Sequence, residues 1–181
     1  VTVSNLSSSR ALRDVTEAHG GKYYASAVGE VNVTTLMREK GAIIGGEGNG
    51  GVIYPAIHAG RDAMVGVALF LSNLAHKKMK VSALKKTYPE YHIAKNRIEL
   101  SDKSLIDKIL NRLQEIFADQ DVNTVDGVKI SFEDKREWVH LRKSNTEPII
   151  RIYSEAKTVE RAVALGNEVI EVARGIINEG A

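Results

Sequence analysis

The sequence contains no cysteine, only three prolines and a single tryptophan among its 181 residues. The lack of cysteine excludes disulfides, thiolate zinc sites and a cysteine nucleophile, and it fits the reducing cytoplasm, where we expect the protein to work. The longest apolar run, residues 63–71, is about half of the roughly 20 residues that span a bilayer. Because the N-terminus shows neither a cationic start nor a cleavage site, no membrane association or export is expected.

An excess of one charge sign is also lacking, since 25 Lys and Arg stand against 23 Asp and Glu and give a net charge of +2. A balance this even produces no strong field and fits the binding of small anions as well as nucleic acid. The nucleic-acid alternative would use five lysines: Lys77, Lys78, Lys80, Lys85 and Lys86. Because these lysines fit a solvated helix end and a linker, no nucleic-acid partner is expected.

Short apolar strands alternate with helices in the first half of the chain, residues 1–90. We expect strands at 1–3, 22–28 and 42–45, a short extended piece at 52–54, and helices at 8–20, 32–40 and 62–79. Ser8 or Ser9 would cap the first helix. This alternation predicts a layered α/β domain with a mixed, largely parallel sheet. The linker is placed at 85–96, where Pro89 disfavours helix at the preceding residue.

Strands are grouped together in the second half, residues 91–181. We expect strands at 92–100, 122–125, 128–133, 138–143 and 149–153, a helix capped by Ser101, and a final helix at 159–177. Asp126-Gly127 is a strong signal for a two-residue type I′ hairpin. The grouping predicts an α+β domain in which helices cover one face of a single antiparallel sheet.

The stretch GGEGNGG, residues 45–51, contains the G-x-G-x-x-G pattern of dinucleotide-binding turns. Such a turn needs a helix at its third glycine, but Gly51 precedes an extended Val-Ile-Tyr-Pro and Glu47 would repel phosphate. A glycine-rich turn with an incidental glutamate is one alternative. In the interpretation that we prefer, glycines let the backbone approach a ligand, while Glu47 and Asn49 match adjacent hydroxyls. That combination describes a sugar site.

The stretch RKSNTEPIIR, residues 142–151, gathers donors for an anion in one short turn between two strands. Arg142 can form forked charge-assisted bonds to phosphate, and the turn can expose backbone N–H groups. Further side-chain donors are Ser144, Asn145 and Thr146. The alternative is a polar hairpin with ordinary turn chemistry.

Strand alternation around this turn predicts one apolar and one polar face. Trp138, His140 and Arg142 should share a face, and Arg151 should alternate with the apolar residues of the next strand. The apolar face would lie under the helices, and the other would present two arginines near the turn. His140 either lines the phosphate site or is an ordinary surface histidine.

At these two loops the sequence resembles the α-D-phosphohexomutases, the phosphoglucomutase/phosphomannomutase superfamily that includes phosphoglucosamine mutase. RKSNTEPIIRIYSEA is similar to that family's phosphate-binding signature R-x-S-N-T-E-P, and GGEGNGG looks like its sugar-binding G-E-x-S-G loop. The resemblance includes VSNLSSSRAL and GRDAMVGVALFL. It implies the third and fourth of four domains. Residues 1–90 would be a sugar-binding α/β domain truncated at its N-terminus, and residues 91–181 a phosphate-binding domain like the TATA-box-binding protein.

The resemblance also implies a reaction and a set of roles. Phosphate would pass reversibly between the 1 and 6 positions of a hexose phosphate substrate, through a phosphoserine, with Mg²⁺ and a hexose 1,6-bisphosphate. The sugar would be bound by Glu47, Gly48 and Asn49. The phosphate would be bound by Arg142, Ser144, Asn145, Thr146 and Arg151.

Two family segments are absent from this sequence, T-A-S-H-N-P for the phosphoserine and D-G-D-G-D-R for the metal. We therefore assign no catalytic residue and no metal ligand, and we interpret residues 7–9 as helix-capping serines. The chain alone is expected to be inactive and to depend on domains 1 and 2; a non-catalytic sugar-phosphate-binding module is the alternative. Asn49, Gly51 and Glu30 depart from the family pattern. The hexose is therefore left open among glucose, mannose and glucosamine, with a slight lean toward a glucosamine-phosphate or broad archaeal-like subgroup.

Overall fold

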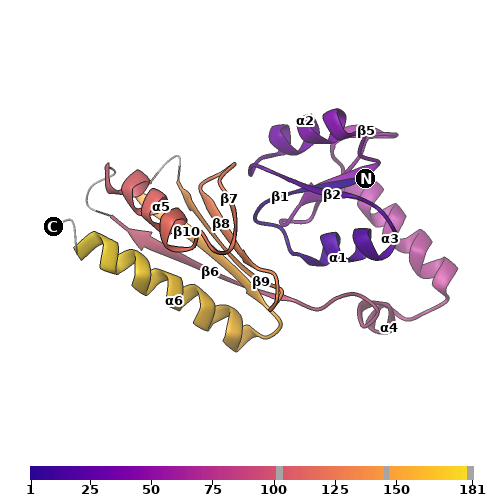
Figure 1. Cartoon of the computed structure of the whole chain (residues 1–181). Coiled ribbons are helices and arrows are strands. Elements are labelled where there is room, and N and C mark those ends of the chain that lie inside the picture. The colour runs from indigo at the N-terminus through magenta and orange to yellow at the C-terminus, as the bar shows by residue number, and fades with distance from the viewer. Residues whose placement is uncertain (101–103, 145–146, 179–181) are drawn as a thin grey trace. The chain divides into compact units, whose positions relative to one another are not determined.

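The computed structural model describes residues 1–100, 104–144 and 147–178. The chain forms two compact units, Val1–Glu90 and Tyr91–Ala181. Each unit is built on its own five-stranded sheet (Figure 1).

The sheet of the first unit has the strand order β2-β1-β3-β4-β5. Its strands are β1 (Thr2–Asn5), β2 (Tyr23–Ser26), β3 (Ile44–Glu47), β4 (Gly51–Tyr54) and β5 (His58–Arg61). β1 is parallel to β2 and β3, whereas β4 and β5 add antiparallel pairings. The mixed α/β sheet is therefore confirmed. β5 was not predicted, because His-Ala-Gly-Arg shows no apolar alternation.

Four helices accompany this sheet: α1 (Ala11–Ala18), α2 (Glu30–Lys40), α3 (Ala63–Lys77) and α4 (Val81–Lys85). α2 packs on the sheet and closes a small core made of Val3, Val33, Met37, Ala42 and Ile53. At the start of α1, Ser9 Oγ accepts a hydrogen bond from the Ala11 N–H at 3.2 Å. Ser8 is not the cap, since its hydroxyl donates to Asn5 Oδ1 at 2.9 Å. α4 was not predicted either.

An unusual feature of α3 is that it has no buried residue although it is the most apolar helix of this unit. Its Asp62 cap accepts a hydrogen bond from the Val65 N–H at 3.0 Å, so the helix start is well formed. Several large apolar side chains of α3 are exposed: Met64, Val67, Leu69, Phe70 and Leu71. Among the described residues, no helix is both long and apolar enough to cross a membrane.

The sheet of the second unit is antiparallel throughout and has the order β6-β10-β9-β8-β7. Its strands are β6 (His92–Glu99), β7 (Asp121–Asn123), β8 (Val128–Phe132), β9 (Glu137–Lys143) and β10 (Ile149–Ala156). α5 (Ser104–Ile116) and α6 (Val159–Asn178) pack against its apolar face. This arrangement confirms the predicted α+β architecture. The predicted Ser101 cap lies outside the described residues.

The connection between β7 and β8 is longer than the predicted two-residue turn. Four residues separate the two strands. The Val125 N–H donates to Asn123 Oδ1 at 3.0 Å, so the turn begins directly after β7. Gly127 has a φ of +73°, and a Cβ there would lie 2.8 Å from the Cα of Arg142. The turn is therefore folded down onto β9, which requires glycine at this position.

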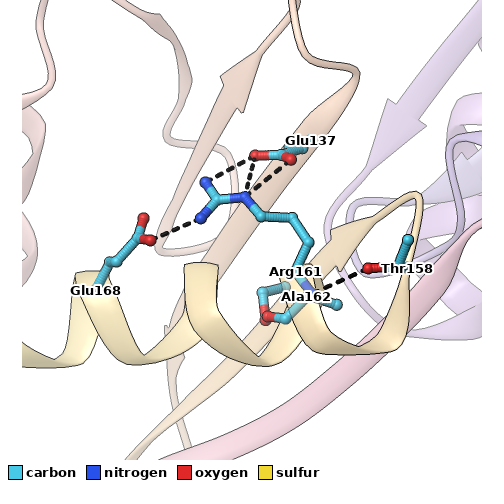
Figure 2. A network of polar contacts seen from close by, with 6 residues as sticks. Glu137, Thr158, Arg161, Ala162 and Glu168 are labelled. Atoms are coloured by element: carbon cyan, nitrogen blue, oxygen red, sulfur yellow. Dashed lines mark hydrogen bonds and ion pairs between the residues drawn. The ribbon is translucent and has the colours of Figure 1, made fainter.

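The first turn of α6 is tied to β9 by a guanidinium (Figure 2). Arg161 donates from Nε and from Nη2 to the Glu137 carboxylate at 2.9 to 3.1 Å, and from Nη1 to Glu168 at 2.6 Å. Glu137 is buried, so its charge depends on this partner. The Arg161 N–H also donates to Thr158 Oγ1 at 3.2 Å, which satisfies a backbone group at the helix start.

Replacing Arg161 with alanine should destabilise the second unit by roughly 2 kcal/mol, because the buried Glu137 carboxylate would lose its cation. Urea unfolding followed by the fluorescence of the single tryptophan, Trp138, would report this unit alone. The matched control is Arg174→Ala, which removes an exposed pair with Glu171 on the same helix and should cost less than about 0.5 kcal/mol. Equal losses in the two variants would contradict a special role for the Glu137 pair.

Candidate functional site

The glycine-rich stretch is a hairpin loop between β3 and β4. The Gly50 N–H donates to the Glu47 carbonyl at 3.1 Å, and the Gly51 N–H donates to Asn49 Oδ1 at 3.0 Å. Gly51 opens an antiparallel strand rather than a helix, so the loop lacks the helix N-terminus that a dinucleotide turn presents to pyrophosphate. Gly48 lies against the chain at Ser8, since a Cβ there would be 3.1 Å from the Ser8 Cα. Part of the glycine content thus serves internal packing.

Glu47 is held from two sides by residues of the first unit. Asn5 Nδ2 donates to Glu47 Oε1 at 3.0 Å, and Arg61 Nη1 lies 3.7 Å from Glu47 Oε2. Only 6% of the Glu47 side chain is exposed. The carboxylate is therefore pre-positioned at the base of the loop, while Asn49 at its tip is exposed. Contacts of Glu47, Gly48 and Asn49 with sugar hydroxyls stay a prediction.

Arg61 connects Glu47 to a second carboxylate, Glu30, at the start of α2. The Arg61 backbone N–H donates to Glu30 Oε1 at 2.9 Å and its Nε donates to Oε2 at 2.7 Å. Both hydrogen bonds lower the pKa of Glu30. The one from the Arg61 backbone N–H has the larger effect, and the one from the Arg61 side chain has the next largest. Gly51 leaves the space for Arg61, because a Cβ at Gly51 would lie 2.5 Å from the Arg61 Cδ.

Glu30, Asn49 and Arg61 line an open pocket of about 530 Å³ in the first unit, within the usual size range of small-molecule sites. Glu47 and Gly48 do not line it; they line a separate pocket of about 310 Å³ that shares only Gly50 and Gly51 with the first. The lining of the larger pocket includes Glu30, Asn49, Gly50, Gly51, Arg61 and Asp62. The lining combines carboxylate acceptors, an amide and a guanidinium, which suit a polyhydroxylated ligand.

Asn5 and Arg61 were missed as members of this constellation. A signal for Asn5 exists, because β1 and β3 are parallel neighbours and the carboxyl ends of such strands meet at one edge of the sheet. Arg61 belongs to β5, which the sequence pattern did not predict. Its position beside Glu47 therefore could not be inferred from the sequence. Glu30 was noted only as a departure from the family pattern.

Replacing Arg61 with methionine should raise the pKa of Glu30 only part of the way to its ordinary value, because the backbone N–H at position 61 still donates to this carboxylate. The side-chain carboxyl ¹³C shift of Glu30, followed by NMR as a function of pH, measures this. Arg38→Met, on an exposed arginine of α2, is the control and should leave the titration unchanged. An Arg61→Met titration identical to that of the wild type would contradict the role given to the guanidinium.

The connection between β9 and β10 closes tightly at its base. The Ser144 N–H donates to the Ile149 carbonyl at 3.0 Å, and the Ile149 N–H donates to the Glu147 carbonyl at 2.9 Å. Asn145 and Thr146, which were predicted to bind phosphate, lie outside the described residues. Ser144 is half-buried at the start of this connection. The phosphate roles of all three residues remain predictions.

Arg142 and Arg151 are direct partners in the ladder between β9 and β10. Their neighbours Leu141, Ile150 and Ile152 belong to the core under the helices, so both arginines lie on the opposite face, as the alternation predicted. Arg151 pairs with Glu147 at 3.0 Å. The Nε of Arg142 is buried and has no hydrogen-bond partner in the described part of the chain, an arrangement that costs free energy unless a ligand supplies an acceptor.

His140 is neither an ordinary surface histidine nor available to a ligand, since only 1% of it is exposed. Its Nε2 is hydrogen-bonded to the Asp126 carbonyl at 2.6 Å, and burial lowers the pKa of His140 to about 4. The β7–β8 turn covers this part of the polar face, which the alternation could not show. Next to it, Trp138 Nε1 donates to the buried Glu155 at 2.6 Å.

Within residues 1–100, 104–144 and 147–178, no three His, Asp or Glu side chains cluster as metal ligands would.

Comparison with protein families identifies both units. A family profile described as "Phosphoglucomutase/phosphomannomutase, alpha/beta/alpha domain III" matches residues 1–91. A second, described as "Phosphoglucomutase/phosphomannomutase, C-terminal domain", matches residues 96–172. The matched segments contain the glycine loop and the RKSNTEP turn, respectively.

Curated relatives and solved structures agree with these profiles. A phosphoglucomutase/phosphomannomutase from Thermococcus kodakarensis is 35% identical over 176 residues, which cover 94% of this chain and 38% of the relative. A phosphoglucosamine/phosphogalactosamine mutase from Sulfurisphaera tokodaii is 32% identical over 175 residues, covering 96% and 38%. The crystal structure of a phosphoglucomutase/phosphomannomutase family protein from Burkholderia thailandensis superposes with a TM-score of 0.74 at 23% identity, covering 96% and 37%. The chain thus spans less than half the length of these proteins.

Proposed function

Because this chain belongs to the phosphoglucomutase/phosphomannomutase family, we propose that it is the substrate-binding part of an enzyme that interconverts hexose 1-phosphates and hexose 6-phosphates. In this proposal the first unit binds the sugar through Glu47, Gly48 and Asn49. The second unit binds the phosphate through the turn at 144–146 with Arg142 and Arg151.

The observation that carries the proposal is the pair of arginines on the polar face of the second sheet. Arg142 and Arg151 are register partners on β9 and β10, the two strands that the RKSNTEP turn joins, and the buried Nε of Arg142 has no partner among the described residues. Adjacent guanidiniums repel one another, and a phosphate dianion removes that repulsion and accepts the missing hydrogen bond.

An amino hexose is the substrate that the larger pocket of the first unit supports best. Its lining carries the carboxylates of Glu30 and Asp62 against the single guanidinium of Arg61, so the local charge favours a cationic amino group. The Sulfurisphaera relative is named for two amino hexoses. We therefore take glucosamine 6-phosphate as the first candidate and glucose 6-phosphate as the second.

The catalytic step belongs to parts of the enzyme beyond these residues in our proposal. A phosphoserine would exchange phosphate with the substrate, a hexose 1,6-bisphosphate would be the intermediate, and Mg²⁺ would neutralise the developing charge. The exposed apolar side of α3 supports the view that further parts of the enzyme, domains 1 and 2, pack against this chain. The lack of cysteine supports activity in the cytoplasm.

Calorimetric titration of the 181-residue chain tests the binding proposal, with glucosamine 6-phosphate, glucosamine and inorganic phosphate as separate ligands. The sugar phosphate should bind at least roughly 10-fold more tightly than glucosamine, because charge-assisted bonds dominate the affinity. Sugar-phosphate binding no tighter than that of glucosamine would overturn the proposal. In a mutase assay with hexose 1,6-bisphosphate and Mg²⁺, the chain alone should show no turnover.

A further inference from the structure

The polar face of the second sheet carries a row of three arginines, one more than the stretch RKSNTEPIIR contains. In the ladders of this sheet, Arg151 on β10 is the direct partner of Arg142 on β9 and of Arg97 on β6. These strands are neighbours in the order β6-β10-β9 (Figure 1). The Cβ atoms of direct cross-strand partners lie about 5 Å apart. The three arginine side chains therefore leave the backbone next to one another on adjacent strands.

All three arginines lie on the face away from the helices. The residue that follows Arg97, Ile98, is buried in the core under α5 and α6 together with Leu141 and Ile150. Because successive side chains of a strand alternate between faces, Arg97 shares the opposite face with Arg142 and Arg151. The register thus assigns Arg97 to the surface that carries the proposed phosphate site.

The carboxylates near the row do not neutralise it strongly. Arg97 pairs with Glu99 at 2.9 Å, with side chains 64% and 70% exposed, and Arg151 pairs with Glu147 at 3.0 Å, with 38% and 51% exposed. Exposed pairs of this kind contribute little and exchange readily with other partners. Like charges placed directly opposite one another destabilise a sheet, so the row costs stability unless an anion binds to it.

The row also lies beside the backbone of the RKSNTEP turn. The Leu100 N–H, three residues after Arg97, donates to the Pro148 carbonyl at 3.0 Å, and the Ser144 N–H, two residues after Arg142, donates to the Ile149 carbonyl at 3.0 Å. The turn is therefore attached to both outer strands of the row. An anion held at this turn is within reach of a long, flexible side chain at position 97.

We propose that Arg97 is a third cationic binding residue of the phosphate site, acting with Arg142 and Arg151 on the phosphate monoester of the substrate. This inference rests on the phosphate role proposed for that site. The partly buried Arg142 forms the inner end of the row, and the exposed Arg97 forms its outer end. Arg97 exchanges Glu99 for a phosphate oxygen when the sugar phosphate binds.

The test compares Arg97→Gln with wild type in the 181-residue chain, using glucosamine 6-phosphate as the titrant in calorimetry. Arg97→Gln should weaken binding roughly five-fold, on the scale of one exposed charge-assisted hydrogen bond, and should reduce the dependence of affinity on salt. Arg97→Lys should recover most of the affinity. The melting temperature of the ligand-free Arg97→Gln chain should stay equal or rise, because repulsion within the row is relieved.

A matched control is Arg112→Gln on α5. Arg112 is similarly exposed and pairs with an exposed glutamate, Glu115, at 2.7 Å, so its replacement changes the net charge equally but should leave affinity unchanged. Equal weakening in both variants would mean that only the overall charge matters and would overturn the inference. A lower melting temperature in Arg97→Gln together with weaker binding would also overturn it, by pointing to a structural role.

If Arg97→Gln binds as tightly as wild type while Arg142→Ala loses affinity, Arg97 is not part of the site and the proposed function stands. If wild type binds glucosamine 6-phosphate no more tightly than glucosamine, both the proposed function and the inference fail.

Discussion

Replacing Arg142 with alanine is expected to weaken the binding of glucosamine 6-phosphate to this chain by roughly 100-fold, which is the scale for removing one partner of a buried charge-assisted interaction. The expectation rests on the buried Nε of Arg142, which has no hydrogen-bond partner among the described residues. Calorimetric titration of the variant and the wild type, in the same buffer and salt, gives the ratio of dissociation constants.

The same substitution should leave the ligand-free second unit as stable as wild type or slightly more stable. Removing Arg142 takes away an unsatisfied buried donor and one of several adjacent cations. Arg112→Ala serves as the control on α5 and should change neither affinity nor stability by a measurable amount. An Arg142→Ala chain that binds with wild-type affinity would remove the phosphate site from the position that we assign to it.

Acidification should destabilise the second unit by about 3 kcal/mol between pH 6.5 and pH 4 through His140 alone. The pKa of His140 is about 4 in the folded chain, against an ordinary value of 6.5. Over this window the unfolded chain takes up a proton that the folded chain does not, so stability falls as the pH falls. The gap between the two pKa values corresponds to about 3 kcal/mol, since one pKa unit is worth about 1.4 kcal/mol.

His140→Gln isolates this contribution, because the glutamine amide can still donate to the Asp126 carbonyl but does not titrate. The free energy of unfolding is measured in urea at several pH values, with Trp138 fluorescence as the probe of the second unit. The difference in the free energy of unfolding between wild type and variant should change by about 3 kcal/mol between pH 6.5 and pH 4. Above pH 7 this difference should stay constant. His76→Gln, on an exposed histidine of α3, should show no such change. A pH-independent difference for His140→Gln would show that His140 does not titrate as described.

Several parts of the fold and site follow from local sequence patterns. The period-two alternation around the RKSNTEP turn correctly predicted that Arg142 and Arg151 share a face and that Leu141 and Ile150 lie in the core. The alternation of strands and helices correctly predicted a mixed sheet in the first half, and the grouping of strands an antiparallel sheet in the second. These features depend on neighbours in the chain, and side-chain direction in a strand is set by the pleat alone.

Other features depend on which distant segments meet, and local patterns do not contain that information. The Asp126-Gly127 signal predicted a short turn, yet the four-residue connection folds onto β9 and buries His140. Glu47 was singled out by its glycine-rich loop, but its two partners come from the end of β1 and from the unpredicted strand β5.

The sequence by itself determined the two fold classes, the family and the two loops to which we assign sugar and phosphate binding. These features follow from the periodicity of apolar residues and from short motifs, which a single sequence contains. Tertiary structure alone decided that Arg97 joins Arg142 and Arg151, that Arg61 links Glu30 to Glu47, and that His140 is buried and neutral. The physical reason is that cross-strand register and burial are set by long-range pairing, which places residues tens of positions apart within one side-chain length of each other.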